Sequence, residues 1–273
     1  MMDSNNNFIS SESLFNLHIN KEIWDDIAEY KDEYAVVLAY REMYRILFAH
    51  RAPQIHYRAF LIKHLKDAAI TMKLTHCTLH LAVYLLDIFM DNHSITSERI
   101  LLLANCCLLI AGKVEEYYMK TPKITELNWL VPYPYTVKDY KILEAHILKY
   151  FEWNIMIPTA AHYVHYYLQA AVTKEDVRLK QQGVATIVRD MHTTIRTYLD
   201  KVLDDVHYMQ RHKPSLLSAA IISIARQANK LSEWHEQLEQ FTHYTCSDIQ
   251  FTKMMLLETL PLPCTDCGLT ITS

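Results

Sequence analysis

Apolar residues recur at helical spacing along most of this chain, and the longest apolar run is RILLLANCCLLIAGKVEE, residues 99–116. A helix that is apolar around most of its circumference is buried, because a half-exposed helix would carry a polar face. The run is also too short to cross a bilayer, which requires about 20 apolar residues. We therefore predict a core helix that is capped by Ser97 and has a charged end, where Lys113 lies.

The same periodicity predicts helices on both sides of this run. In the first half they cover residues 21–48, 54–72, 77–91, 122–130 and 137–151, with Thr75 and Thr136 as N-caps and Pro122 at a favoured first position. In the second half they cover residues 159–171, 175–203, 213–229, 233–241 and 246–260. The first of these helices, 21–48, is polar all round, which favours a place on the surface of the protein rather than in its core.

Two charged residues interrupt apolar stripes in the first half. Lys113 follows Cys106 and Ile110 on one helix face, and Glu144 lies between Tyr140 and Ile147 on another. A charge on an apolar face requires a partner, because taking it out of water unpaired is costly. The residues alone therefore favour a buried salt bridge inside one domain, with a purely structural role.

An internal repeat indicates two domains. Residues 99–113 align with residues 213–227 through shared apolar positions, and each segment lies midway through a run of about five predicted helices. Two domains are also the usual expectation for a chain of 273 residues. Lys113 aligns with Gln227, so the charge belongs to the first copy alone.

Composition narrows the functional classes. Only three glycines occur, which disfavours strand-rich folds and glycine-rich phosphate loops, so we predict an all-α protein. The net charge is −4 with no dense basic stretch, which argues against nucleic-acid binding. Residues 1–20 are polar and are expected to be disordered. Neither a signal peptide nor a disulfide pattern is recognisable, which favours a reducing intracellular compartment.

Cysteine and histidine spacings give weak metal-binding signals. The CxxC at residues 264–267 has no second pair and lies in a tail, residues 263–273, that we expect to be flexible. Two histidine pairs have helical spacing, His76 with His80 and His162 with His165, yet neither has a carboxylate at a typical ligand offset. We therefore predict no metal site. An α-helical metal-dependent hydrolase remains a rival interpretation that metal analysis of the purified protein would test.

Several segments, in this order, resemble the cyclin box: YRAFLIKHL, HLAVYLLDIFM, LLIAGKVEE, and LEAHILKYF followed by IPTA. The likeness covers roughly residues 40–260 and includes PSLLSAAIIS in the second half. It implies two tandem five-helix cyclin boxes, residues 49–157 and 158–262, preceded by an N-terminal helical segment, residues 21–48.

The resemblance also implies a function, that of a regulatory subunit that binds and activates a cyclin-dependent protein kinase in cell-cycle control. Such a subunit has no catalysis or cofactor of its own, and the nucleus is its favoured intracellular location. In the family, a lysine and a glutamate that match Lys113 and Glu144 pair with each other and contact the kinase, and Glu116 matches the same face. The alternative is a cyclin-fold transcription-associated scaffold without kinase activation, which would need a basic face to bind DNA.

Two further sets of residues match family positions. Arg58 and Asp87 match a pair that joins two helices inside the box, which we expect to be structural. Tyr57, Leu61 and His64 match the patch through which kinase substrates or inhibitors dock. His64 stands there in place of a large apolar ring, which weakens the case for docking at this patch.

Overall fold

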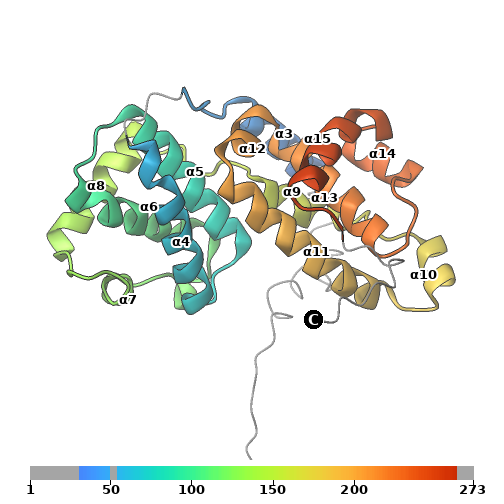
Figure 1. Ribbon diagram of the computed structural model, residues 1–273, viewed down its shortest axis with the longest axis horizontal. Helices are drawn as coiled ribbons and strands as arrows, with labels where there is room; N and C mark the ends of the chain where they lie inside the picture. The colour runs from blue at the N-terminus through green and yellow to red at the C-terminus, as the bar shows by residue number, and fades with distance from the viewer. Residues whose placement is uncertain (1–30, 50–53, 263–273) are drawn as a thin grey trace, which may run out of the picture.

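The computed structural model describes residues 31–49 and 54–262, and this part of the chain consists of helices and connecting segments without any strand. Figure 1 shows two helical bundles side by side. The first contains α4 (Arg58–Met72), α5 (His76–Asn92), α6 (Ile100–Glu115), α7 (Ile124–Asn128) and α8 (Val137–Tyr150), with short 3-10 turns η2 (Ile55–Tyr57), η3 (Ser97–Arg99) and η4 (Tyr118–Lys120). The predicted all-α fold is confirmed.

The second bundle is divided into shorter helices than the sequence predicts. It contains α9 (Ala160–Tyr167), α10 (Lys174–Lys180), α11 (Val184–Asp204), α12 (Val206–Arg211), α13 (Pro214–Ala228), α14 (Glu236–Thr242) and α15 (Cys246–Thr259). The helix predicted over 175–203 is broken, because Gln181 takes a left-handed conformation at φ 53° and Gly183 begins a new helix. The short helix α12 was not predicted at all.

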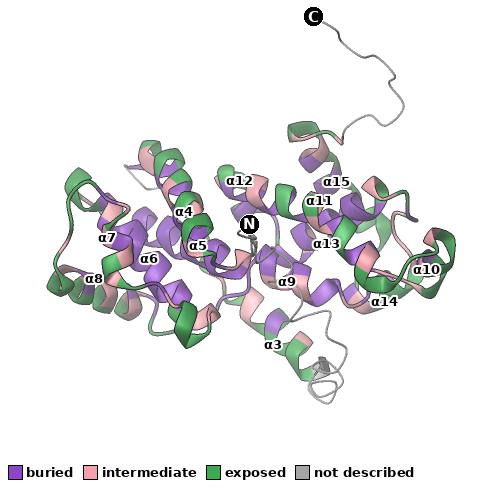
Figure 2. Cartoon of the chain, turned by 90° about the horizontal axis from the view of Figure 1, so that it is seen from below, coloured by how far each residue is buried: buried purple, intermediate pink, exposed green. Residues whose placement is uncertain are grey.

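The helices α6 and α13 are the buried central helices of the first and the second bundle respectively. Nearly every residue of α6 from Ile100 to Gly112 is buried, which matches the prediction of a core helix. Figure 2 shows the same burial along α6 and α13, with exposed residues on the outer helices. Gly112 has a specific packing role, since a Cβ atom there would lie 2.4 Å from Cδ of Pro122. Glycine therefore lets the segment after α6 pack against the helix itself.

Helix starts in the first bundle were predicted with mixed success. Thr75 and Thr136 accept hydrogen bonds from backbone amides of α5 and α8, as predicted. Ser97 is wrong as a cap, because residues 97–99 form the 3-10 turn η3 and α6 starts only at Ile100. Pro122 is also not the first residue of α7, which starts two residues later, after Lys123.

The N-terminal helix α3 (Lys31–Met43) packs against the second bundle. The Glu42 carboxylate accepts hydrogen bonds from the backbone amide and the hydroxyl of Ser215, both at 2.8 Å, at the start of α13. The ring of Tyr34 meets Tyr166 of α9 edge to face, with 5.7 Å between centroids. Of the predicted segment 21–48, residues 21–30 lie outside the described residues, as do 1–20 and the tail 263–273.

Polar contacts join the two bundles. The Arg58 guanidinium donates to the backbone carbonyl of Asp204 at 3.0 Å, and Lys66 Nζ lies 2.5 Å from a carboxylate oxygen of the same residue. Both contacts meet the C-terminal end of α11, where backbone carbonyls lack helical partners and cations are favoured.

Among the described helices, none is long and apolar enough to span a membrane.

Candidate partner-binding site at the end of the central helix

The end of α6 presents a charged pair. Lys113 Nζ lies 2.5 Å from Oε1 of Glu144 on α8, so the two charges that interrupt apolar stripes do meet. The pair is not buried, which corrects the sequence-based expectation: 49% of the Lys113 side chain is exposed, against 18% for Glu144. The reason is positional, since Lys113 lies in the last turn of α6, where the helix reaches the edge of the bundle.

This pair has unused hydrogen-bonding capacity. An ammonium group has three donors, and Glu144 is the only side-chain or backbone acceptor found for Lys113 within residues 31–49 and 54–262. The carboxylate of Glu144 likewise retains free lone pairs. An exposed ion pair of this kind contributes little to stability, typically about 0–1 kcal/mol. Its geometry therefore suits contact with another molecule better than it suits a role in holding the fold.

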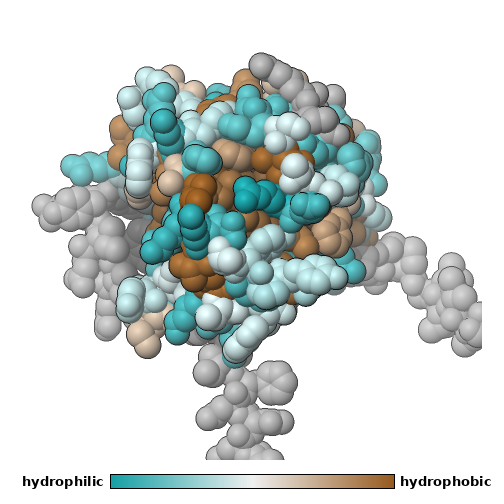
Figure 3. Space-filling view, turned by 90° about the vertical axis from the view of Figure 1, so that its left-hand side faces the viewer, coloured by the Kyte–Doolittle hydropathy of each residue, from teal (hydrophilic) through white to brown (hydrophobic). Residues whose placement is uncertain are grey.

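Exposed apolar side chains lie on segments that adjoin α6 and α8 along the chain. They belong to η4 and the residue before it, to the segment between α7 and α8, and to α8 itself: Tyr117, Tyr118, Met119, Trp129, Tyr133, Val137 and Ile142. Figure 3 views the molecule from the side of the first bundle and shows apolar and polar side chains interleaved across that face. Partner-binding surfaces combine large apolar and aromatic residues with a few charges in this way.

Glu116 lies one residue beyond α6 and has an internal role. Its Oε1 accepts hydrogen bonds from the backbone amide of Thr75 and from the hydroxyl of Thr78, both at 2.6 Å. A carboxylate at a helix N-terminus satisfies amides that lack helical partners. The structure therefore uses one oxygen of Glu116 to fix the start of α5 against the end of α6, which no sequence signal indicated.

Arg58 and Asp87 form the pair that the resemblance implied. The guanidinium donates two hydrogen bonds of 2.9 Å to the two carboxylate oxygens, and both side chains are buried. Burial raises the pKa of the Asp87 carboxyl, although Arg58 opposes that shift. The further bond from Arg58 to the Asp204 carbonyl extends this pair across the junction between the bundles.

The candidate substrate-docking residues do not form an open patch. Leu61 is 0% exposed, because α4 turns the stripe that contains Leu61, Leu65 and Ala68 into the core. His64 is half-buried, and its Nε2 lies 2.8 Å from Oδ1 of the buried Asn105. Tyr57 packs against the edge of the core. The prediction that Leu61 contributes to a docking surface is therefore wrong.

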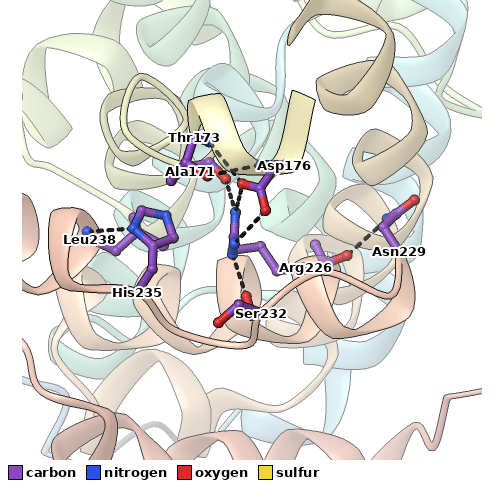
Figure 4. Close-up of polar contacts among 9 residues, drawn as sticks. Ala171, Thr173, Asp176, Arg226, Asn229, Ser232, His235 and Leu238 are labelled. Atoms are coloured by element: carbon purple, nitrogen blue, oxygen red, sulfur yellow. Dashed lines mark hydrogen bonds and ion pairs between the residues drawn. The ribbon is translucent and has the colours of Figure 1, made fainter. Parts of the chain in front are cut away.

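A second charged site, in the second bundle, was missed by the sequence analysis. Arg226, near the end of α13, is 0% exposed and donates to both carboxylate oxygens of Asp176 at 2.8 and 3.2 Å. It also donates to the carbonyls of Ala171 and Ser232, as Figure 4 shows. Burial alone would raise the pKa of Asp176, yet hydrogen bonds from Arg226 and Thr173 outweigh it and lower that pKa. The sequence signal that could have identified Arg226 is a charged residue within an otherwise apolar helix.

Comparisons with known proteins agree with this architecture. Residues 29–156 match the cyclin N-terminal domain and residues 158–264 match the cyclin C-terminal domain. Cyclin-J of Xenopus laevis is 31% identical over 216 residues, which cover 76% of this chain and 56% of that protein. The chain thus spans about half the length of these curated relatives. The segments HLAVYLLDIFMDNHSI, PKITELN and PTAAHYVHYYL resemble cyclin J in sequence, in agreement with this comparison.

Two solved structures share the fold. A viral cyclin from herpesvirus saimiri superposes with a TM-score of 0.62 at 17% identity and covers 84% of this chain and 97% of its own. A chain of the yeast RNA polymerase II CTD kinase CTDK-1 complex superposes with a TM-score of 0.51 at 14% identity, over 74% of this chain and 64% of its own. With both family domains matched in tandem, this chain belongs to the cyclin family.

Proposed function

We propose that this chain is a regulatory subunit that binds and activates a cyclin-dependent protein kinase through the end of α6 and the middle of α8. The observation that carries the proposal is the partly exposed Lys113–Glu144 pair, which retains donors and acceptors in a bundle whose adjoining segments carry exposed apolar side chains. Glu116 supports the same face from inside, because it fixes the end of α6 to the start of α5. Membership of the cyclin family and the kinase complex named for one structural relative support the same partner class.

Activation would follow from preferential binding. A kinase that samples active and inactive positions of its regulatory helix is shifted towards the active one by a partner that binds that position more tightly. The ammonium of Lys113 is suited to backbone carbonyls of such a helix, and the free carboxylate lone pairs of Glu144 are suited to backbone amides. ATP, metal and chemistry would then belong to the kinase alone, in the service of cell-cycle control, with the nucleus as the favoured location.

The test is a pull-down of kinases from cell extract with the full chain, followed by a kinase assay of the captured complex. We expect Lys113→Ala combined with Glu144→Ala to abolish capture while helical content, measured by circular dichroism, is unchanged. Lys149→Ala is a matched control, because Lys149 is an exposed lysine on the same helix as Glu144 but on a different face. Capture of a kinase by the double variant at the wild-type level contradicts the proposed interface. Capture of an inactive kinase by the wild type favours the scaffold alternative.

A further inference from the structure

Three side chains of different chemistry converge where the two bundles meet. Cys77 comes from the first turn of α5, Glu115 from the end of α6, and His162 from α9 of the second bundle. A thiol sulfur, a carboxylate oxygen and a ring nitrogen from these residues all lie within 4.8 Å of one another. The closest approach measured among them is 3.1 Å, between His162 Nε2 and Glu115 Oε1.

A second histidine lies beside the thiol but is not part of this cluster. His165 Nδ1 is 3.6 Å from the sulfur of Cys77, whereas the atoms that lie within 4.8 Å of one another belong to Cys77, Glu115 and His162. Cys77 is buried, and His162 and Glu115 are partly buried, so solvent has limited access to the three donors.

This donor set is one that zinc prefers. Zinc binds sulfur at about 2.3 Å and nitrogen or oxygen at about 2.0–2.2 Å in tetrahedral geometry, which separates neighbouring donors by roughly 3.3–3.6 Å. The separation of 3.1 Å between His162 and Glu115 is close to those values, and the sulfur of Cys77 lies within 4.8 Å of both. Mixed sulfur, nitrogen and oxygen ligands also favour zinc over magnesium or calcium, which take oxygen ligands.

The surroundings of His162 permit both a free and a metal-bound state. Its Nδ1 lies 2.7 Å from the hydroxyl and 3.1 Å from the backbone amide of Thr159. Without metal, Nδ1 accepts from the Thr159 amide and the Nε2 proton is donated to Glu115. Binding of an ion through Nε2 moves the proton to Nδ1, which then donates to the Thr159 hydroxyl oxygen, and the Thr159 amide loses its acceptor.

We propose that Cys77, Glu115 and His162 form a three-ligand zinc site that joins the two cyclin boxes, with water in the fourth position. On binding, the Cys77 thiol releases its proton to solvent, and the thiolate and the Glu115 carboxylate balance the charge of the ion. Cys77 and Glu115 come from the first bundle and His162 from the second, so the ion adds a link between α5 and α6 on one side and α9 on the other. The sequence analysis rejected the histidine pair for want of a nearby carboxylate, and the fold supplies that carboxylate from another helix.

The test measures zinc binding by the full chain, with Cys264→Ser and Cys267→Ser as background so that the thiols of the tail do not bind. Zinc ions compete against a chromophoric chelator, and cobalt in place of zinc reports thiolate ligation by its charge-transfer absorption. We expect one ion per chain, with an affinity at least about tenfold lower in Cys77→Ser and in His162→Gln. Cys246→Ser is the matched control, since Cys246 is exposed and distant from the other donors along the chain.

Several outcomes would overturn the zinc site. They are absence of one-to-one binding by the background protein, equal affinity in Cys77→Ser and the background protein, and a cobalt spectrum without a thiolate band. Circular dichroism of each variant shows whether it folds, and Glu115→Gln replaces His162→Gln if the latter does not. Because these readouts involve no kinase, failure of the zinc site leaves the proposed function to its own test.

Discussion

The two central helices end in opposite ways. Arg226 of α13 is 0% exposed and donates to one carboxylate and two backbone carbonyls, so every side of its guanidinium is used inside the bundle. Lys113 of α6 lies at the neighbouring position of the repeat, is half exposed, and contacts Glu144 alone among the described residues. Arg226 is therefore bonded inside its own bundle, whereas the charge of Lys113 is half exposed to solvent.

The choice of residue fits each role. A guanidinium is planar and presents five donors in a fixed fork, which suits several acceptors held rigidly around a buried site. An ammonium on a flexible stem is strongly hydrated and loses little by remaining at the surface until a partner arrives. The comparison teaches that neighbouring positions of a repeated fold can both carry a cation and yet differ in burial, one bonded inside its bundle and the other half exposed.

The largest effect is expected from Arg226→Ala. This change leaves the carboxylate of Asp176, 4% exposed, without its cationic partner and leaves two carbonyls without donors. Breaking a buried ion pair in this way costs about 3–5 kcal/mol in the free energy of unfolding. Urea denaturation measures it, with Arg189→Ala, a change on α11, as a comparison variant. A decrease in the free energy of unfolding below about 1 kcal/mol would show that the contacts of Arg226 are not important for the stability of the second bundle.

Arg58→Ala is expected to have a similar or slightly smaller effect, about 3–5 kcal/mol, because Asp87 is left buried and unpaired. The bond to the Asp204 carbonyl is lost at the same time, so the two bundles should unfold less cooperatively. Thermal unfolding followed by circular dichroism measures both features. An unchanged unfolding curve counts against the pair as a structural link.

The stability of the second bundle should depend on pH through the carboxyl group of Asp176. The pKa of Asp176 is lowered in the folded state from its ordinary value of 3.8, so folding favours the ionised carboxylate. Its contribution is fully present above that value and is lost as the pH falls through the lower folded-state pKa. Asp176→Asn should therefore be less stable than the wild type near neutral pH, and the gap should narrow below about pH 4. A gap that is constant with pH would contradict the shift.

The smallest effect on stability is expected from Lys113→Gln, which copies the residue that the repeat carries at Gln227. Because the pair with Glu144 is half exposed, the free energy of unfolding should change by no more than about 1 kcal/mol. A double-mutant cycle with Glu144→Gln measures the coupling. A coupling of several kcal/mol would mean that the pair has a structural role after all, as the residues alone first suggested.

Much of this architecture could be predicted from the sequence. Periodicity located the core helices and flagged Lys113 and Glu144, because a charge within an apolar stripe is a local signal. Periodicity could not show how deeply Lys113 and Glu144 are buried, because their burial depends on where the bundle ends around α6. Leu61 was misplaced because a family match gives a position along a helix and not the face that this chain buries.

Other features depend on contacts between distant segments. Arg226 finds Asp176 fifty residues away, and Glu115 meets His162 across the junction between the bundles. No spacing rule along one helix can indicate such a pair, because the separation is set by the packing of several helices. Ser97 failed for a local reason, since the chain inserts a 3-10 turn between the cap-like residue and α6.

The contacts at Asp204 have a consequence for any molecule that touches both bundles. Arg58 and Lys66 both bond Asp204 at the end of α11 from two positions along α4, so a rotation of one bundle against the other must break two charge-assisted bonds together. The spacing of surfaces on the two halves is therefore set before a partner arrives. A ligand that spans them spends little of its binding free energy on conformational entropy, because that ordering was completed when the chain folded.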